Sequence, residues 1–140
     1  MIRHRRAPDL RCIVAAALAP LVAGLALAHQ VAAQPPDLVG SWSGGGSVSF
    51  GGGAREAARC RAHYTRTSSR SYLLNATCAT PSGRASQTAT LRHAGGGTFH
   101  GSFFNREYNV TGRIFVVVRG GRQTVRLSSD FGSALFELRR

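Results

Sequence analysis

The chain has 140 residues, of which 18 are arginine or lysine and six are acidic, so its formal net charge is +12. Every basic residue is arginine. A chain of this length builds one modest core, which excludes two domains of ordinary size. The charge predicts attraction to anionic surfaces such as acidic lipids or polysaccharides, and salt should weaken that attraction.

Residues 1–33 have the pattern of a secretory signal peptide. A basic segment precedes an apolar run from Cys12 to Ala28, and small residues follow before Gln34. We expect cleavage after Ala33, or alternatively after Ala28. The mature chain would keep 14 arginines and five acidic residues, a net charge of +9. The pattern therefore predicts a periplasmic or secreted protein, and export argues against nucleic acid as the partner.

Two cysteines, Cys60 and Cys78, remain in the mature chain and predict a disulfide in an oxidising compartment. If they face each other across a hairpin, Ala62 meets Ala76 and Tyr64 meets Leu74. Strand side chains alternate between two faces, and this register puts the apolar residues of both strands on one face. The pattern therefore predicts a hairpin with its tip at residues 67–71. A bridge across such a loop contributes about 3 kcal/mol in the chain-entropy model.

The rest of the mature chain shows the two-residue period of β-strands between turn signals. Residues 34–38 should be an extended lead-in, and residues 39–140 should form one domain. Its first strand should run over residues 39–50, with a bulge or sharp bend at Gly44–Gly46. Five further strands are expected at residues 85–92, 98–104, 108–119, 122–128 and 133–140.

Short strands joined by consecutive hairpins predict an all-β fold, a single antiparallel up-and-down barrel of about eight strands. A β-sandwich is the alternative. The core should contain the inward residues Trp42, Tyr64, Leu74, Phe99, Phe103, Ile114, Val116 and Phe136. Small inward residues leave room for a cavity, namely the alanines at positions 58, 62, 76, 85 and 89.

The sequence Gly40-Ser41-Trp42 near the mature start resembles the G-x-W signature of small secreted antiparallel barrels. These include lipocalins, avidins and bacterial protease inhibitors. The resemblance implies that Trp42 closes one barrel end and is covered by an arginine from near the last strand, here Arg139 or Arg140. An arginine stacked over tryptophan contributes about 0.5 to 2 kcal/mol.

A longer pattern, G-x-W-x-G-x-G followed by C-R-x-x-Y, begins at Gly40 and continues at Cys60. It resembles exported proteins of high-GC alphaproteobacteria, a likeness that implies no activity.

No catalytic or metal-binding motif is evident. The three histidines of the mature chain, His63, His93 and His100, have no carboxylate close in sequence, and no nucleophile elbow is present. We therefore expect no enzyme activity, no cofactor and no metal. One outward-facing apolar group stands out as a candidate interface, formed by Phe104, Phe115 and Val117 with Arg113.

These features predict a non-enzymatic binding module, a soluble monomer that holds an unknown ligand or protein partner at one barrel mouth. An anionic envelope surface is a further candidate partner. One alternative is an outer-membrane or envelope structural barrel, although arginine-rich outward faces suit this poorly. The other is a periplasmic or secreted protease inhibitor, which rests on the fold resemblance.

Overall fold

The computed structural model of the protein describes residues 37–140. The predicted signal peptide and most of the predicted lead-in lie outside these residues. The described chain forms eight strands: β1 (Gly40–Phe50), β2 (Arg55–Arg66), β3 (Ser71–Thr80), β4 (Gly83–Gly95), β5 (Thr98–Asn105), β6 (Val110–Arg119), β7 (Arg122–Ser129) and β8 (Gly132–Arg139). Residues 37–140 hold no helix with the length and hydropathy of a membrane span.

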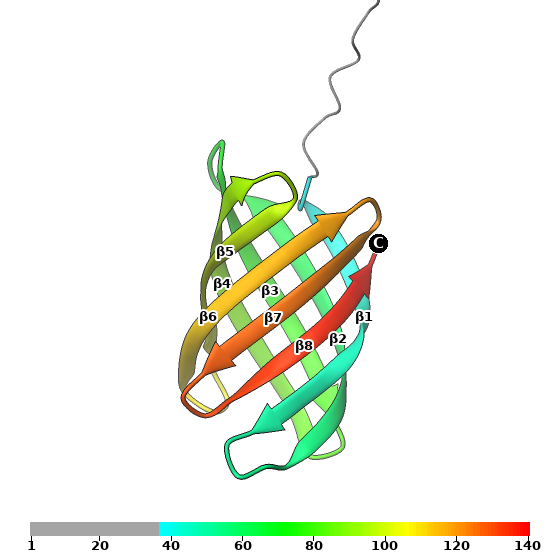
Figure 1. Ribbon diagram of the computed structural model, residues 1–140, viewed down its shortest axis with the longest axis vertical. Helices are drawn as coiled ribbons and strands as arrows, with labels where there is room; N and C mark the ends of the chain where they lie inside the picture. Colours follow the sequence, from blue (N-terminus) through cyan, green and yellow to red (C-terminus); the bar gives the residue numbers. More distant parts are fainter. Residues whose placement is uncertain (1–36) are drawn as a thin grey trace, which may run out of the picture. The chain divides into compact units, whose positions relative to one another are not determined.

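The strands form a closed barrel in which each pairs with its neighbours in sequence and β1 also pairs with β8 (Figure 1). All pairs are antiparallel. The predicted up-and-down barrel is confirmed, and the β-sandwich alternative is wrong. Closure gives every strand two partners, so no edge is left open among these eight strands.

The cysteine hairpin has the predicted register. Cys60 lies opposite Cys78, Ala62 opposite Ala76, and Tyr64 opposite Leu74. The two cysteines form a disulfide between β2 and β3. The inward alternation of apolar residues on these two strands therefore predicted both the pairing and the face that is buried.

The barrel interior is the core of the domain. All eight predicted core side chains are at most 7% exposed. Alternation is clearest in β6, where Ile114, Val116 and Val118 are buried and Arg113 and Arg119 are exposed. Burying such side chains contributes about 1.5–3 kcal/mol each.

The expected bulge at Gly44–Gly46 is wrong, because β1 pairs with β2 and β8 without a shift in register. These glycines instead permit a close approach of two backbones. A Cβ atom added at Gly46 would lie 1.9 Å from the carbonyl oxygen of Leu135, and one at Gly44 would lie 2.0 Å from that of Glu137. The irregularity in the sheet lies between His93 and Gly95, where β4 shifts against β5.

Candidate functional site

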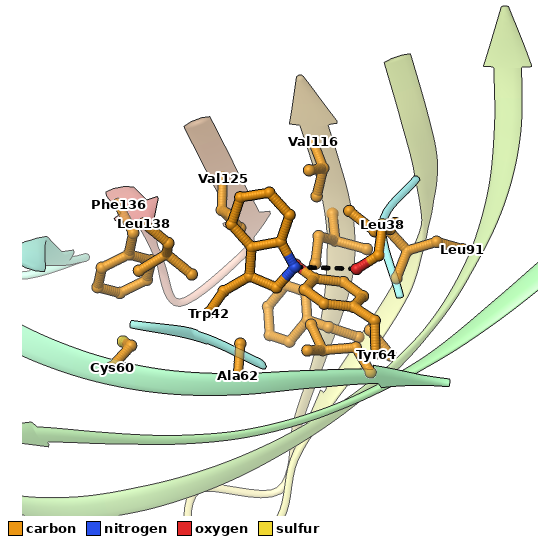
Figure 2. Close-up of a cluster of buried hydrophobic side chains, with 14 of the residues drawn as sticks. Leu38, Trp42, Cys60, Ala62, Tyr64, Leu91, Val116, Val125, Phe136 and Leu138 are labelled. Carbon is orange, nitrogen blue, oxygen red and sulfur yellow. Dashed lines mark hydrogen bonds between the residues drawn. The ribbon is translucent and has the colours of Figure 1, made fainter. Parts of the chain in front are cut away.

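The two ends of the barrel differ. At one end, where the chain also terminates, Trp42 is 2% exposed and its Nε1–H donates to the carbonyl of Leu38 at 2.9 Å (Figure 2). Arg140 covers the indole, with its guanidinium carbon 4.3 Å from the ring centroid. The same guanidinium donates to the carbonyls of Asp37 and Val39, at 2.6 and 3.2 Å. Of the two candidate arginines, Arg140 therefore occupies this place, while Arg139 is exposed on β8.

A buried polar pair lies beneath this end. The hydroxyl of Tyr64 donates to Oε1 of Gln123 at 2.8 Å, and the two residues are 0% and 1% exposed. Burial raises the pKa of the Tyr64 hydroxyl, which keeps it protonated as a donor. The Nε2 group of Gln123 has no hydrogen-bond partner among residues 37–140. This end of the barrel is filled, which leaves the opposite end as the place for a ligand.

The opposite end, at the bottom of Figure 1, opens into a cavity of about 320 Å³, which we call the mouth cavity. Its walls are mostly apolar, and the disulfide contributes through Cys78. The apolar lining includes Val48, Phe50, Ala85, Phe103, Val110, Leu127 and Ala134. A concave apolar cavity with a few polar groups is the usual form of a small-molecule site.

Two carboxamide side chains stand out in this apolar lining. Gln87 of β4 and Asn105 of β5 lie directly opposite each other on the inner face. Asn105 is 8% exposed, and its Oδ1 accepts a hydrogen bond from the backbone N–H of Tyr108 at 3.1 Å. Neither side chain makes a further hydrogen bond within residues 37–140, so Nδ2 of Asn105 and the Gln87 amide remain available to a ligand.

An acidic residue, Glu56, lies beside the mouth cavity. It faces inward on β2, opposite Val48, which lines the cavity. Its Oε1 accepts a hydrogen bond from the hydroxyl of Ser82, and this bond is the main reason that the pKa of Glu56 is lowered. Its Oε2 is buried and has no partner among the described residues. The open end therefore carries an ionised group with unused acceptor capacity.

Two exposed aromatic side chains form the rim. Tyr108, in the turn between β5 and β6, is 56% exposed, and Phe131, between β7 and β8, is 68% exposed. Both line the mouth cavity. Large apolar side chains at the edge of an apolar cavity can cover a bound ligand without a change in the barrel.

The candidate interface predicted from the sequence is divided by the strand register. Phe104 and Phe115 are both outward, at 40% and 42% exposed. Phe104, however, lies opposite Thr111, whereas Phe115 lies opposite His100 and Arg126. Val117 is half-buried. The structure therefore places Arg113, Phe115 and Val117 along one strand, β6, and separates Phe104 from them.

The histidines do not meet. Nδ1 of His63 lies 3.0 Å from the hydroxyl of Ser41, and Nε2 of His93 lies 2.6 Å from the carbonyl of Gly96. Within residues 37–140 there is no group of three or more histidine, cysteine or acidic side chains that could hold a metal ion.

No protein-family model and no curated protein matches the chain. Among solved structures, the redesigned β-barrel mFAP1, bound to DFHBI, is similar with a TM-score of 0.63 at 15% identity, over 74% of this chain and 94% of that one. The redesigned barrel mFAP0, also bound to DFHBI, has a TM-score of 0.61 at 15% identity, with 74% and 98% covered. A de novo designed fluorescence-activating β-barrel has a TM-score of 0.57 at 13% identity, with 73% and 92% covered.

At these identities the likeness shows the fold alone, that of a small antiparallel β-barrel. The finer resemblances to lipocalins and to exported alphaproteobacterial proteins stay predictions.

Sequence reasoning did not select the polar residues of the mouth cavity. A signal was nevertheless present, because Asn105 continues the inward series of Phe103, and Gln87 lies between the inward residues Ala85 and Ala89. A carboxamide on a core face needs a hydrogen-bond partner. Such a residue is therefore a candidate for ligand recognition.

Proposed function

We propose that the protein is a non-enzymatic binding module that takes up a small, mostly apolar ligand through the open end of the barrel. The ligand carries at least one polar group, which Gln87 and Asn105 bind. The observation that carries this proposal is the mouth cavity itself, apolar in its walls and with two carboxamides side by side.

The lining of the cavity supports binding without catalysis. None of the side chains that line it is a histidine, an aspartate, a glutamate or an arginine. General acid or base catalysis and nucleophilic catalysis normally rest on such groups or on a nucleophile held by them. The size of the cavity, about 320 Å³, is at the lower end of the range for small-molecule sites and selects a compact ligand.

The similar solved structures support the proposal in one respect. Two of them, mFAP1 and mFAP0, are barrels bound to DFHBI. A closed barrel of this size is therefore able to hold a small molecule. The chemistry of the ligand of this chain comes from its own lining residues and not from that likeness.

The outward faces favour the binding module over an outer-membrane barrel. Exposed arginines lie along β2, β4, β6 and β7, at Arg59, Arg61, Arg92, Arg113 and Arg126. A barrel in a membrane needs an outward apolar band, and charged residues on that band are destabilising. The protease-inhibitor alternative rests on fold resemblance alone, so we do not adopt it. Export to the periplasm or beyond remains the expectation from residues 1–33.

Titration with a neutral apolar fluorophore, N-phenyl-1-naphthylamine, tests the proposal. Ala134→Phe fills part of the mouth cavity from β8, and Ala79→Phe adds the same side chain on the exposed face of β3 as a matched control. We expect the wild type and Ala79→Phe to bind the fluorophore alike. Ala134→Phe should bind it at least about tenfold more weakly, because about 1.4 kcal/mol of contact is lost. Equal binding by the three proteins would refute a site in the mouth cavity.

A further inference from the structure

A second surface, separate from the mouth cavity, lies on the outside of the barrel. It is a shallow groove across β6, β7, β8 and β1, which lie side by side toward the viewer in Figure 1, and it extends to the start of β2. Three arginines line this outer groove, Arg55, Arg113 and Arg126, together with His100. No carboxylate lines it.

The strand register orders these side chains in two rows. In the first row Arg113 is followed across the strands by Ser128, Ser133, Ser49 and Arg55, each opposite the next. This row therefore has a guanidinium at each end and three hydroxyl groups between them.

The second row runs beside the first, two residues along each strand. Phe115 lies opposite Arg126, Arg126 opposite Leu135, and Leu135 opposite Ser47. Phe115 and Leu135 are each 42% exposed. A hydrogen bond of 2.8 Å from the guanidinium of Arg55 to the hydroxyl of Ser47 joins the two rows.

The three arginines are not neutralised by the protein. The one ion pair within residues 37–140 joins Arg66 to Asp37 at the other end of the barrel. Unpaired guanidinium groups around hydroxyl groups form a surface that attracts anions and donates hydrogen bonds to their oxygens.

The length of the first row selects the kind of anion. Neighbouring strands lie about 4.8 Å apart, so Arg113 and Arg55, four strands apart, are separated by about 19 Å along the surface. A single phosphate or sulfate cannot contact both. The row also follows the curvature of a closed barrel of eight strands, so its ends face different directions. A flat membrane cannot contact both ends at once, whereas a flexible polyanion can.

We propose that the outer groove binds an acidic polysaccharide, with the arginines on its anionic groups and the serines on its hydroxyl groups. Phe115 and Leu135 offer apolar contact to the sugar rings. A single-stranded polynucleotide would instead need several aromatic platforms for its bases. Phe115 is the one aromatic side chain of the groove apart from His100. This site does not depend on the mouth cavity.

Binding of dextran sulfate and polygalacturonate, with neutral dextran of the same length as reference, tests the proposal by calorimetry at low salt. The test variant is Arg113→Gln with Arg126→Gln. The matched control is Arg59→Gln with Arg119→Gln, which removes the same charge from the outer surface outside the groove. We expect binding of the acidic polymers only, about tenfold weaker in the test variant because exposed ion pairs are each worth up to about 1 kcal/mol. The control should lose less than about twofold, since only the general field changes.

Several results would overturn the proposal. Equal losses in test and control variants would mean attraction by net charge without a site. Tighter binding of oligothymidylate would assign the groove to nucleic acid, and tighter binding of phosphatidylglycerol vesicles would assign it to a lipid surface. Inorganic phosphate that competes at equal affinity would reduce it to a small-anion site. If the double variant does not fold, Arg55→Gln serves instead, and unchanged binding of the apolar fluorophore shows that the barrel is intact.

Discussion

At the scale of single residues, the closed end of the barrel depends on Arg140. Its guanidinium lies over Trp42 and donates to two backbone carbonyls of the segment before β1. It therefore ties the last residue of the chain to the start of the barrel. Cation–π contacts of this kind are worth about 0.5–2 kcal/mol.

Arg140→Ala should lower the free energy of unfolding by about 1–2 kcal/mol, because the stacking contact and the carbonyl hydrogen bonds are lost together. It should also shift the emission of Trp42 to longer wavelength as water reaches the indole. Arg139→Ala is the matched control and should change stability by less than about 0.5 kcal/mol. Equal effects of the two variants in urea unfolding would show that the stacking contributes nothing.

The Tyr64–Gln123 pair makes stability depend on pH. Burial raises the pKa of Tyr64, so above the ordinary tyrosine pKa of about 10 the unfolded chain loses a proton that the folded barrel keeps. This contribution is fully present below that pH and is lost as pH rises above it.

Tyr64→Phe should therefore flatten the fall in stability between pH 8 and pH 11, measured by urea unfolding. At pH 8 the same variant should cost about 1–3 kcal/mol, because Gln123 loses its hydrogen-bond donor in the core. Adding Gln123→Met should recover part of that cost, since no unpaired polar group then remains. A pH dependence identical to that of the wild type would mean that Tyr64 ionises freely in the folded state.

At the scale of the strands, the glycines of β1 separate two functions of one residue type. Gly46 leaves no room for a Cβ atom beside β8, whereas a Cβ at Gly45 would lie 3.4 Å from the carbonyl oxygen of Ala58, an ordinary contact. Gly46 is thus required by packing, and Gly45 is not.

Gly46→Ala should destabilise the barrel by about 1–3 kcal/mol, since β1 and β8 must move apart. Gly45→Ala should be neutral or stabilise by up to about 1 kcal/mol, because alanine restricts the unfolded chain. Thermal unfolding of the two variants measures the difference. A stable Gly46→Ala barrel would mean that β1 and β8 are free to separate.

The same strands show what the sequence could and could not predict. The register of β2 on β3 was predictable because two cysteines and the alternation of apolar residues select the same pairing. The bulge in β1 was wrong because glycine tolerates both an irregular backbone and a close approach. Only the position of β8 distinguishes these. Likewise β6 begins at Val110 and not at Tyr108, since Asn109 has a φ of 51° in the preceding turn.

At the scale of the whole molecule, the two candidate sites came from relations between strands that sequence periodicity does not contain. Alternation predicts whether a side chain points inward or outward, and it did so for Phe115 and Arg113. It does not predict that Phe115, Arg126 and Leu135 form one row, because barrel closure sets that alignment. The pairing of Gln87 with Asn105 depends in the same way on the register of β4 and β5.

The whole barrel thus has a filled end, an open end and a basic outer groove. The filled end holds Trp42 and the Tyr64–Gln123 pair, and the open end holds the mouth cavity. This division supports the central claim that a small ligand occupies the mouth.

Native mass spectrometry of the protein purified from its own host tests that claim most directly. We expect a bound small molecule that leaves on denaturation, is retained in Ala79→Phe, and is absent from Ala134→Phe. A protein that carries no ligand under these conditions, or an adduct that Ala134→Phe retains in full, would contradict the account.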